Sequence, residues 1–227
     1  MSVITKPQRK LIAIASEAPL IKKQFWLAGG TALAEFYLNH RKSRDLDFFT
    51  DSKEDFKTAV REFESTAQTR GITLNIDKKT DTFARYTGTL DDEAVKVEFC
   101  VDAPYRFQPT VESPLGIRVE NSIDITCNKL SALYDRFEIR DYVDVYFIHK
   151  EMYCLDKLIP WAKQKHGGMV NQYLAISFNR IKDVPEDFPM FPDILKHLDK
   201  KDMRKTFLSY AARLINEPFE AKEYKQE

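Results

Sequence analysis

The stretch from Trp26 to Asp51, "WLAGGTALAEFYLNHRKSRDLDFFTD", decides the fold. Its apolar start ends at Gly29-Gly30, about three turns of helix-like sequence follow, and it stops at the apolar segment "DLDFF". Side chains at i and i+2 of a strand share a face, so Asp45 and Asp47 point one way while the apolar residues between them point into the core. Carboxylates are rare in apolar strands, so two on one face require an explanation.

Asp45 and Asp47 would repel each other, so something must compensate their charge. At an effective dielectric of ~20, two carboxylates a few ångström apart repel each other by a few kcal/mol. Either one of them takes up a proton or a cation lies between them. A divalent ion is the economical solution, and oxygen-only ligands favour Mg²⁺ or Mn²⁺ over zinc. We therefore expect Asp45 and Asp47 to bind a metal ion.

The two glycines predict an anion site beside these carboxylates. Gly29 and Gly30 at a strand-to-helix turn allow backbone N–H groups to approach a ligand, and the following helix directs its positive end to the same place. Thr31 adds a hydroxyl in the first turn. A phosphate site next to a metal-binding carboxylate pair is the apparatus of phosphoryl or nucleotidyl transfer.

Composition limits the class of protein. The chain has 227 residues, 43% hydrophobic and 12% aromatic, which is enough for one large domain or two modest ones with a real core. Its 35 basic and 35 acidic residues give no support for bulk electrostatic binding to nucleic acid. The three cysteines form no CxxC pair, and no segment reaches the ~18 apolar residues that span a bilayer. We expect a soluble, cytoplasmic protein.

The pattern of apolar residues changes at about residue 120. Before that point it predicts strands and helices, including a hairpin of "FARYTGTL" and "AVKVEFCV" joined by an acidic turn. After it, only helices are predicted. We expect an α/β (α+β) fold, a small mixed sheet flanked by helices in residues 1–120, with residues 121–227 forming a helical region packed on it. The predicted helices are 7–20, 31–39, 51–68, 122–138, 140–152, 155–166, 170–181 and 193–215, with a proline-rich loop at 182–193.

Two blocks of sequence resemble those of AbiEii/AbiGii-type nucleotidyltransferase toxins, which belong to the DNA-polymerase-β-like nucleotidyltransferase superfamily. The first block matches Gly-Gly-Thr-Ala-Leu followed by His-Arg-x-Ser-x-Asp-hydrophobic-Asp. The second is "NKLSALYDRFEIRDYVDVYFI". The matching residues are Gly29, Gly30, Thr31, Ala32, Leu33, His40, Arg41, Ser43, Asp45 and Asp47, then Lys129, Ala132, Leu133, Arg136, Arg140, Asp141 and Asp144.

The resemblance implies a Mg²⁺-dependent enzyme that transfers a nucleoside monophosphate from an NTP to an acceptor. Gly29, Gly30 and Thr31 would hold the β- and γ-phosphates, and Asp45 and Asp47 would bind the metal. Superfamily members bring a further acid from a neighbouring strand. In "AVKVEFCV" Glu98 faces away from the core, so it is the predicted third metal ligand or general base, although the family often has Asp there.

Two alternative roles remain open for each of Arg41, Ser43 and Lys129. Arg41 and Ser43 either contact the triphosphate or fix the loop before Asp45, and Arg41 is also placed to cap a helix end. Lys129 either neutralises phosphate charge or extends from an apolar helix face to solvent. We expect Asp141 to pair with Lys129 or Arg136. Asp144 is the predicted active-site or structural acid, and the choice between the two aspartates stays open.

The resemblance also implies a toxin of a bacterial toxin–antitoxin or phage-defence system that acts with a cognate antitoxin. RNA, and tRNA in particular, is the leading acceptor, and a basic face of the helical half is one surface that would hold it. The alternatives are a nucleotidyltransferase that acts on a protein or a small molecule, and a nucleotide-binding module without turnover. A purely structural protein would leave Asp45 and Asp47 unexplained.

Overall fold

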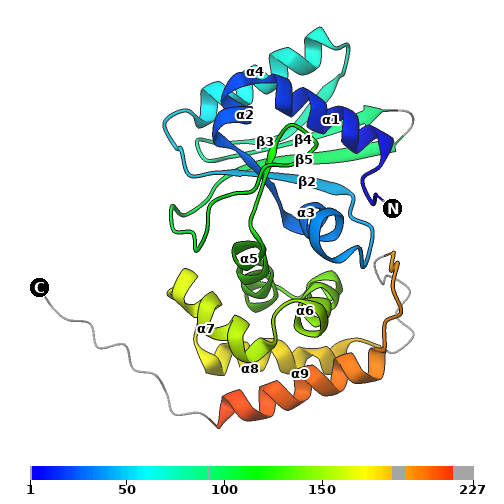
Figure 1. Ribbon diagram of the computed structural model, residues 1–227, viewed down its shortest axis with the longest axis vertical. Helices are drawn as coiled ribbons and strands as arrows, with labels where there is room; N and C mark the ends of the chain where they lie inside the picture. Colours follow the sequence, from blue (N-terminus) through cyan, green and yellow to red (C-terminus); the bar gives the residue numbers. More distant parts are fainter. Residues whose placement is uncertain (1, 91–92, 186–192, 217–227) are drawn as a thin grey trace, which may run out of the picture. The chain divides into compact units, whose positions relative to one another are not determined.

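The computed structural model describes residues 2–90, 93–185 and 193–216 (Figure 1). The chain forms two compact units, Met1–Ile125 and Thr126–Glu227. Helix α5, Ser122–Asp135, begins in the first unit and continues in the second. The predicted separation into two domains at residues 120 and 121 stays a prediction.

A mixed six-stranded sheet, flanked by helices, forms the first unit, as the sequence predicts. The strand order is β3-β4-β5-β2-β1-β6, with β2–β5 and β1–β6 parallel and the other pairs antiparallel. The strands are β1 Trp26–Ala28, β2 Asp45–Thr50, β3 Leu74–Lys79, β4 Phe83–Leu90, β5 Glu93–Val101 and β6 Arg118–Val119. The helices before α5 are α1 Lys6–Glu17, α2 Pro19–Gln24, α3 Gly29–Leu33, the π-helix η1 Ala34–Leu38 and α4 Phe56–Thr69.

Helices α1, α2 and α4 lie on one face of this sheet (Figure 1). Between them and the strands lies an aromatic core centred on Phe99 of β5. Its ring centroid is 4.8 Å from that of Phe63, 5.3 Å from Phe48, 5.8 Å from Phe25 and 6.3 Å from Tyr86. All five side chains are buried. This core fixes which face of each strand points inward, and so which residues remain on the opposite face.

Several predicted helices have limits different from those expected, and three of them show how local sequence sets the limit. Residues 7–20 form two helices, because Ala18 is extended and Pro19 begins α2. The helix expected from Asp51 begins at Phe56, after a turn in which Ser52 hydrogen-bonds Asp55. The helix expected from residue 193 begins at Lys200, where the Asp199 side chain caps it.

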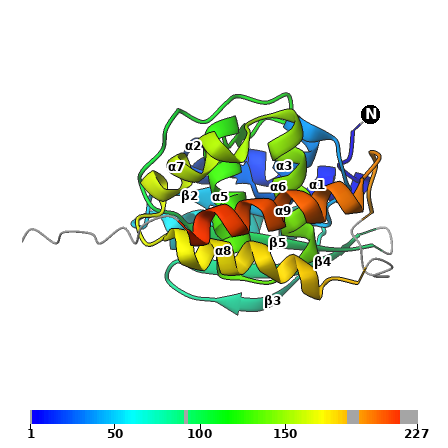
Figure 2. The same cartoon turned by 90° about the horizontal axis from the view of Figure 1, so that it is seen from below.

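The second unit is helical in its described residues, as predicted. After α5 it contains α6 Ile139–Glu151, α7 Leu155–Lys165, α8 Asn171–Asn179, the 3-10 helix η2 Arg180–Asp183 and α9 Lys200–Ile215. Helices α8 and α9 lie side by side (Figures 1 and 2). Phe207 of α9 packs 5.2 Å from both Tyr142 and Phe178, measured between ring centroids. No described helix combines the length and apolar character that crossing a membrane requires.

The central position of Phe99 predicts a large effect of its truncation. Phe99→Ala should lower the free energy of unfolding by about 3–5 kcal/mol, because the cavity removes contacts with four rings. Denaturant unfolding followed by circular dichroism measures this. Ile76→Ala is the control, since Ile76 is 59% exposed and should change stability by less than about 0.5 kcal/mol. Equal effects of the two changes would contradict this assignment of the core.

Candidate nucleotidyl-transfer site

A close approach between Gly29 and Asp47 organises the predicted site. Gly29 follows β1 directly and has φ +66°, in the left-handed region that glycine adopts without strain. A Cβ on Gly29 would lie 1.9 Å from Oδ2 of Asp47. The register of β1 against β2, in which Ala28 pairs with Asp47, brings the two together. Glycine is therefore required here twice, once for its backbone conformation and once for the space that the carboxylate occupies.

Gly30 makes a second close approach, to the loop that precedes β2. A Cβ on Gly30 would lie 2.7 Å from Nη2 of Arg41 and 2.9 Å from Oγ of Ser43. Arg41 is buried and donates from Nη1 to the carbonyl of Lys42 at 2.9 Å. Gln8 of α1 donates to the carbonyl of Ser43 at 2.8 Å, which ties the loop to the first helix. The structure thus brings Arg41 and Ser43 against the glycine turn, and their binding to triphosphate stays a prediction.

Thr31 connects the helix after the turn to the carboxylate strand. Its side chain is buried, and its hydroxyl donates to the backbone carbonyl of Asp45 at 2.5 Å. The helix predicted at residues 31–39 is present but begins two residues earlier, as α3 Gly29–Leu33, and continues as the π-helix Ala34–Leu38. Contact of Thr31 with a phosphate stays a prediction, because the described hydroxyl serves to fasten the two elements.

Strand β2 presents the two carboxylates on one face, as predicted. Leu46 and Phe48 are fully buried, whereas Asp45 and Asp47 are part-exposed. In the parallel pairing with β5, Asp45 lies beside Lys96 and Asp47 lies beside Glu98. Nζ of Lys96 is 3.9 Å from Oδ1 of Asp45. The three predicted metal ligands therefore occupy neighbouring positions on one face of the sheet.

Glu98 has a partner that the sequence analysis did not identify. Arg85 of β4 pairs with Glu98 in register, and its Nε donates to Oε1 of Glu98 at 2.7 Å. Among the described residues, no three His, Cys, Asp or Glu side chains are grouped closely enough to hold a metal ion. The donor chemistry nevertheless fits Mg²⁺, which is commonly bound by one or two carboxylates together with phosphate and water oxygens. Asp45 and Asp47 fit such a site, and Glu98 would join it by leaving Arg85.

The pKa of the Cys100 thiol is affected by burial and by the carboxylates near it. Burial, with added effects of the carboxylates of Asp102, Glu98 and Asp47, raises the pKa of Cys100 to about 11. The thiol is therefore protonated at neutral pH and is not a nucleophile.

Lys129 and Asp144 come together in the second unit. Nζ of Lys129 lies 2.8 Å from Oδ2 of Asp144 and 3.9 Å from Oδ1 of Asp141. Asp141 accepts two hydrogen bonds from Arg136, at 2.7 and 3.1 Å. Both aspartates are fully buried and Lys129 nearly so, which does not agree with an extension of this lysine into solvent. In the structure, Asp141 therefore pairs with Arg136, and Asp144 pairs with Lys129.

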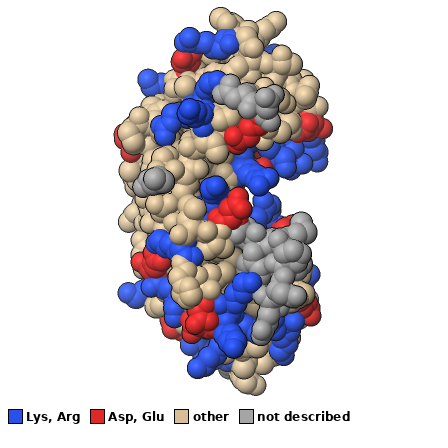
Figure 3. Space-filling model, turned by 90° about the vertical axis from the view of Figure 1, so that its right-hand side faces the viewer, with Lys and Arg blue, Asp and Glu red and all other residues tan. Residues whose placement is uncertain are grey.

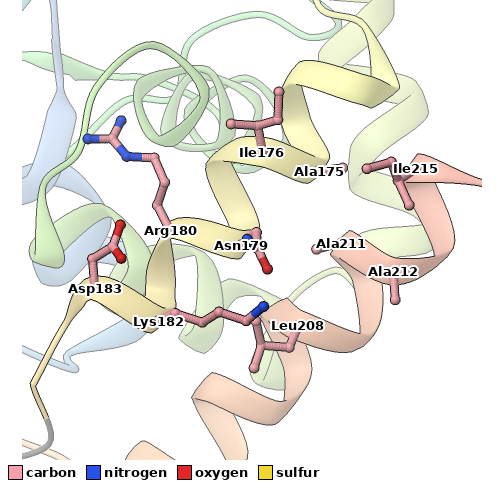
Figure 4. A pocket seen from close by; sticks show the side chains of 10 residues that line it. All are labelled: Ala175, Ile176, Asn179, Arg180, Lys182, Asp183, Leu208, Ala211, Ala212 and Ile215. Carbon is pink, nitrogen blue, oxygen red and sulfur yellow. The ribbon is translucent and has the colours of Figure 1, made fainter.

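Charge elsewhere in the second unit is largely balanced. Figure 3 shows Lys and Arg side chains in separate groups, interspersed with Asp and Glu. Several basic residues of the helical half form ion pairs, namely Lys150 with Asp202, Lys196 with Glu151 and Arg213 with Asp156. A groove of about 440 Å³ between α8 and α9 is lined by apolar side chains such as Ile176, Leu208 and Ile215 (Figure 4). None of the residues predicted for the site lines this groove.

Sequence reasoning missed Arg85, Lys96 and Gln8. Arg85 and Lys96 become neighbours of the carboxylates only through strand pairing. No local sequence pattern predicts the register in which β2, β5 and β4 pair. The parity of Arg85 and Lys96 was a usable signal: both fall on the face of their strands opposite the apolar residues. Gln8 could have been recognised as part of a helix start, because Thr5 and Gln8 form a capping box at the beginning of α1.

Similarity to known proteins agrees with this geometry. Residues 13–222 match the family described as "Nucleotidyl transferase AbiEii toxin, Type IV TA system". An uncharacterised protein of Aquifex aeolicus (strain VF5) is 29% identical over 175 residues, which are 74% of this chain and 78% of the relative.

Solved structures share the fold. A putative nucleotidyltransferase from Helicobacter pylori has a TM-score of 0.57 and 23% identity, with 92% of each chain covered. JHP933 from the same organism has a TM-score of 0.55 and 22% identity, covering 92% of this chain and 89% of the other. MenT4, a nucleotidyltransferase toxin of Mycobacterium tuberculosis H37Rv, has a TM-score of 0.52 and 14% identity, covering 92% and 85%.

The class of protein is thus a nucleotidyltransferase with a mixed α/β core. More particularly, the chain belongs to the AbiEii family of nucleotidyltransferase toxins of type IV toxin–antitoxin systems. The predicted family and enzyme class are confirmed.

The Gly29–Asp47 approach predicts the effect of a single methyl group. Gly29→Ala should abolish nucleotide transfer, because its Cβ displaces the Asp47 carboxylate, and should destabilise the fold by about 1–3 kcal/mol. Gly71→Ala is the matched control, since Gly71 has φ +71° but a Cβ there would meet nothing within 4 Å. Transfer assays and denaturant unfolding of both variants measure the difference. If Gly29→Ala keeps the activity of Gly71→Ala, the close approach has no role in the site.

The Lys129–Asp144 pair predicts a strong dependence of stability on its charge balance. Lys129→Met should lower the free energy of unfolding by about 3–5 kcal/mol, because it leaves the buried Asp144 without its cation. The double variant Lys129→Met/Asp144→Leu should recover most of that loss. Lys57→Met, which breaks the exposed pair with Asp81, is the control and should cost less than about 1 kcal/mol. A double variant no more stable than Lys129→Met would refute the pairing.

Proposed function

We propose that this toxin transfers a nucleoside monophosphate from a Mg²⁺-bound NTP to a hydroxyl group of RNA, with tRNA as the leading acceptor. The observation that supports this most strongly is the Asp47 carboxylate held against the Gly29 backbone, beside the loop of Arg41 and Ser43. This supports the proposal because it would set a metal-binding carboxylate next to an anion site. Neither feature alone would indicate nucleotidyl transfer.

The glycine turn is the end of the site suited to the triphosphate. The helix beginning at Gly29 directs its first N–H groups and the positive end of its dipole to the turn. The guanidinium of Arg41, next to Gly30, adds a fixed cation suited to phosphate oxygens. We assign the β- and γ-phosphates to Gly29, Gly30 and Thr31, with Arg41 and Ser43 bordering them.

The carboxylates of β2 are suited to the reacting end of the nucleotide. Asp45 and Asp47 supply two oxygen donors from one face of a strand whose other face is anchored in the core. When bound there, Mg²⁺ would neutralise the charge that develops on the transferring phosphoryl group and would lower the pKa of the attacking hydroxyl. Because the strand is rigid, the carboxylates hold their positions without reorganisation during the reaction.

Glu98 is suited to accept the proton of the attacking hydroxyl. The oxygen of the acceptor forms a bond to the α-phosphorus, the bond between the α-phosphorus and the bridging oxygen breaks, and pyrophosphate leaves. The proton of the hydroxyl then needs an acceptor beside Asp47, and Glu98 is its neighbour in register on β5. We propose that Glu98 acts as this base or as a third metal ligand once it has separated from Arg85.

Lys129 and Asp144 complete the proposed machinery as a second group. We propose that Lys129 contributes positive charge toward the triphosphate and that Asp144, 2.8 Å away, positions its ammonium group. In this proposal Asp144 acts through Lys129, and Asp141 holds Arg136 in the same network.

The family places this activity in a toxin–antitoxin system. We propose that a cognate antitoxin opposes the toxin, that the pair serves in phage defence, and that the toxin acts in the cytoplasm, where NTP and RNA are present. A protein or small-molecule acceptor is the main alternative. Labelled NTP supplied with total RNA and then with RNA-free lysate separates these, since label found only in protein would exclude RNA.

Removal of the Asp47 charge predicts loss of transfer without loss of fold. Asp47→Asn should lower the rate of transfer by about 100-fold or more, because the metal loses one of its two strand ligands. Its stability should hold or rise, since a repulsion between crowded carboxylates is relieved. Asp81→Asn, in an exposed turn of the same sheet, is the control. Full activity of Asp47→Asn in an assay with labelled NTP would place the site elsewhere.

Dependence on Mg²⁺ is tested independently by thermal shift. At about 100-fold excess over Kd, an NTP should stabilise the protein by about 2.7 kcal/mol with Mg²⁺ and by much less without it. A binding module without turnover would show the same stabilisation but no transfer. Equal stabilisation with and without Mg²⁺ would contradict metal binding by Asp45 and Asp47.

A further inference from the structure

One face of the sheet in the first unit carries polar side chains beyond the carboxylates. On β4 and β5, the residues that alternate with the buried Tyr86 and Phe99 point away from α1 and α4. These side chains are Phe83, Arg85 and Thr87 on β4 and Lys96, Glu98 and Cys100 on β5. This is the face that also presents Asp45 and Asp47, because β2 pairs in register with β5.

The charges on this face change sign along the strand order. Asp47, Glu98 and Arg85 lie next to one another on β2, β5 and β4, and Lys78 of β3 pairs with Arg85. Along this row of four paired residues, the charge is negative on β2 and β5 and positive on β4 and β3. Lys96 of β5 lies beside Asp45, and Asp77 of β3 accepts a hydrogen bond from Thr87, so both lie outside the row. Since neighbouring strands are about 4.8 Å apart, Lys78 lies two strand spacings, or about 10 Å, from Glu98.

Lys78 and Arg85 both lie close to one aromatic ring, that of Phe83. Cζ of Arg85 is 5.2 Å from the centroid of the Phe83 ring, and Nζ of Lys78 is 5.8 Å from it. Phe83 is only part-buried, Lys78 is exposed, and the Arg85 side chain is 39% exposed even while it bonds Glu98. Within the described part of the chain, Lys78 forms no ion pair, and Arg85 uses only its Nε in hydrogen bonding. We call these three residues the Lys78–Phe83–Arg85 track.

The geometry of the reaction indicates what this track faces. In an in-line displacement the attacking oxygen enters opposite the leaving pyrophosphate. The proposed phosphate end is the Gly29 turn after β1, on one side of β2. The attacking hydroxyl must then come from the other side of β2, over β5, and the rest of its molecule continues over β4 and β3.

We propose that the Lys78–Phe83–Arg85 track binds the single-stranded end of an RNA acceptor, next to the hydroxyl that reacts. Lys78 and the free Nη groups of Arg85 contact backbone phosphates, and the Phe83 ring stacks on a base. A polynucleotide matches this combination because it offers negative charge and planar rings alternately along one chain. The inference rests on the proposed function and assigns the surface that would bind the RNA acceptor.

The test measures RNA binding apart from catalysis. The probe is a short, unstructured, labelled RNA with a free 3′-hydroxyl, followed by fluorescence anisotropy without NTP. Phe83→Leu should weaken binding on the order of tenfold by loss of stacking. Lys78→Ala should reduce the slope of log affinity against log salt by about 0.7, the value for one phosphate contact on a single strand. Lys22→Ala, an exposed lysine of α2 on the helix-covered side of the sheet, is the control and should change neither quantity.

Phe83→Trp separates stacking from a general loss of structure, because it keeps a larger ring and should retain or strengthen binding. Equal RNA binding by wild type, Phe83→Leu and Lys78→Ala would overturn the inference, as would a wild-type protein that does not bind the RNA. Binding of an acidic peptide in place of RNA, lost in the same variants, would also overturn it in favour of a protein acceptor. Mg²⁺-dependent stabilisation by NTP, measured on each variant, tests the proposed function separately and should be unchanged in Phe83→Leu and Lys78→Ala.

Discussion

The contact between the Asp47 carboxylate and the Gly29 backbone is the constraint on which the site depends. It requires a residue without Cβ, in the left-handed region, at the first position after β1. It also requires β1 and β2 to pair in the register that sets Ala28 opposite Asp47. The helix, the loop of Arg41 and Ser43, and the hydrogen bond from Thr31 to Asp45 all follow from this one alignment. A carboxylate beside a helix start is acceptable because the helix dipole offsets part of its charge.

The core on the opposite face makes this arrangement rigid. Leu46 and Phe48 anchor β2, and Phe99 anchors β5 among four other rings. Because side chains alternate along a strand, fixing the apolar residues fixes Asp47 and Glu98 on the other face. Rigid placement is what electrostatic catalysis needs, since groups that do not reorganise lose no free energy during the reaction. The stability of the first unit and the geometry of its site thus come from the same alternation.

Much of this architecture could be predicted from the sequence, for identifiable reasons. The parity of Asp45, Asp47 and Glu98 is a local property, and the two strands of the β4–β5 hairpin alternate strongly in sequence. The acidic turn expected between them lies outside the described residues. The family followed from the order of two motifs. The limits of helices were less predictable: Ser52 bonds Asp55 and does not cap a helix from Asp51, and Pro19 divides the first helix in two. The partners of Glu98 and Lys129 depend on strand register and helix packing between distant residues, which no local pattern encodes.

The parallel pairing of β2 with β5 has a consequence for the synthesis of the toxin. The carboxylates of Asp45 and Asp47 emerge from the ribosome early, but Glu98 and its strand follow about fifty residues later. Domains generally fold as units during synthesis, so this sheet is complete only after β5 has left the ribosome, roughly 3–10 s of translation after Asp47. Until then β2 lacks the neighbour that sets Glu98 beside Asp47.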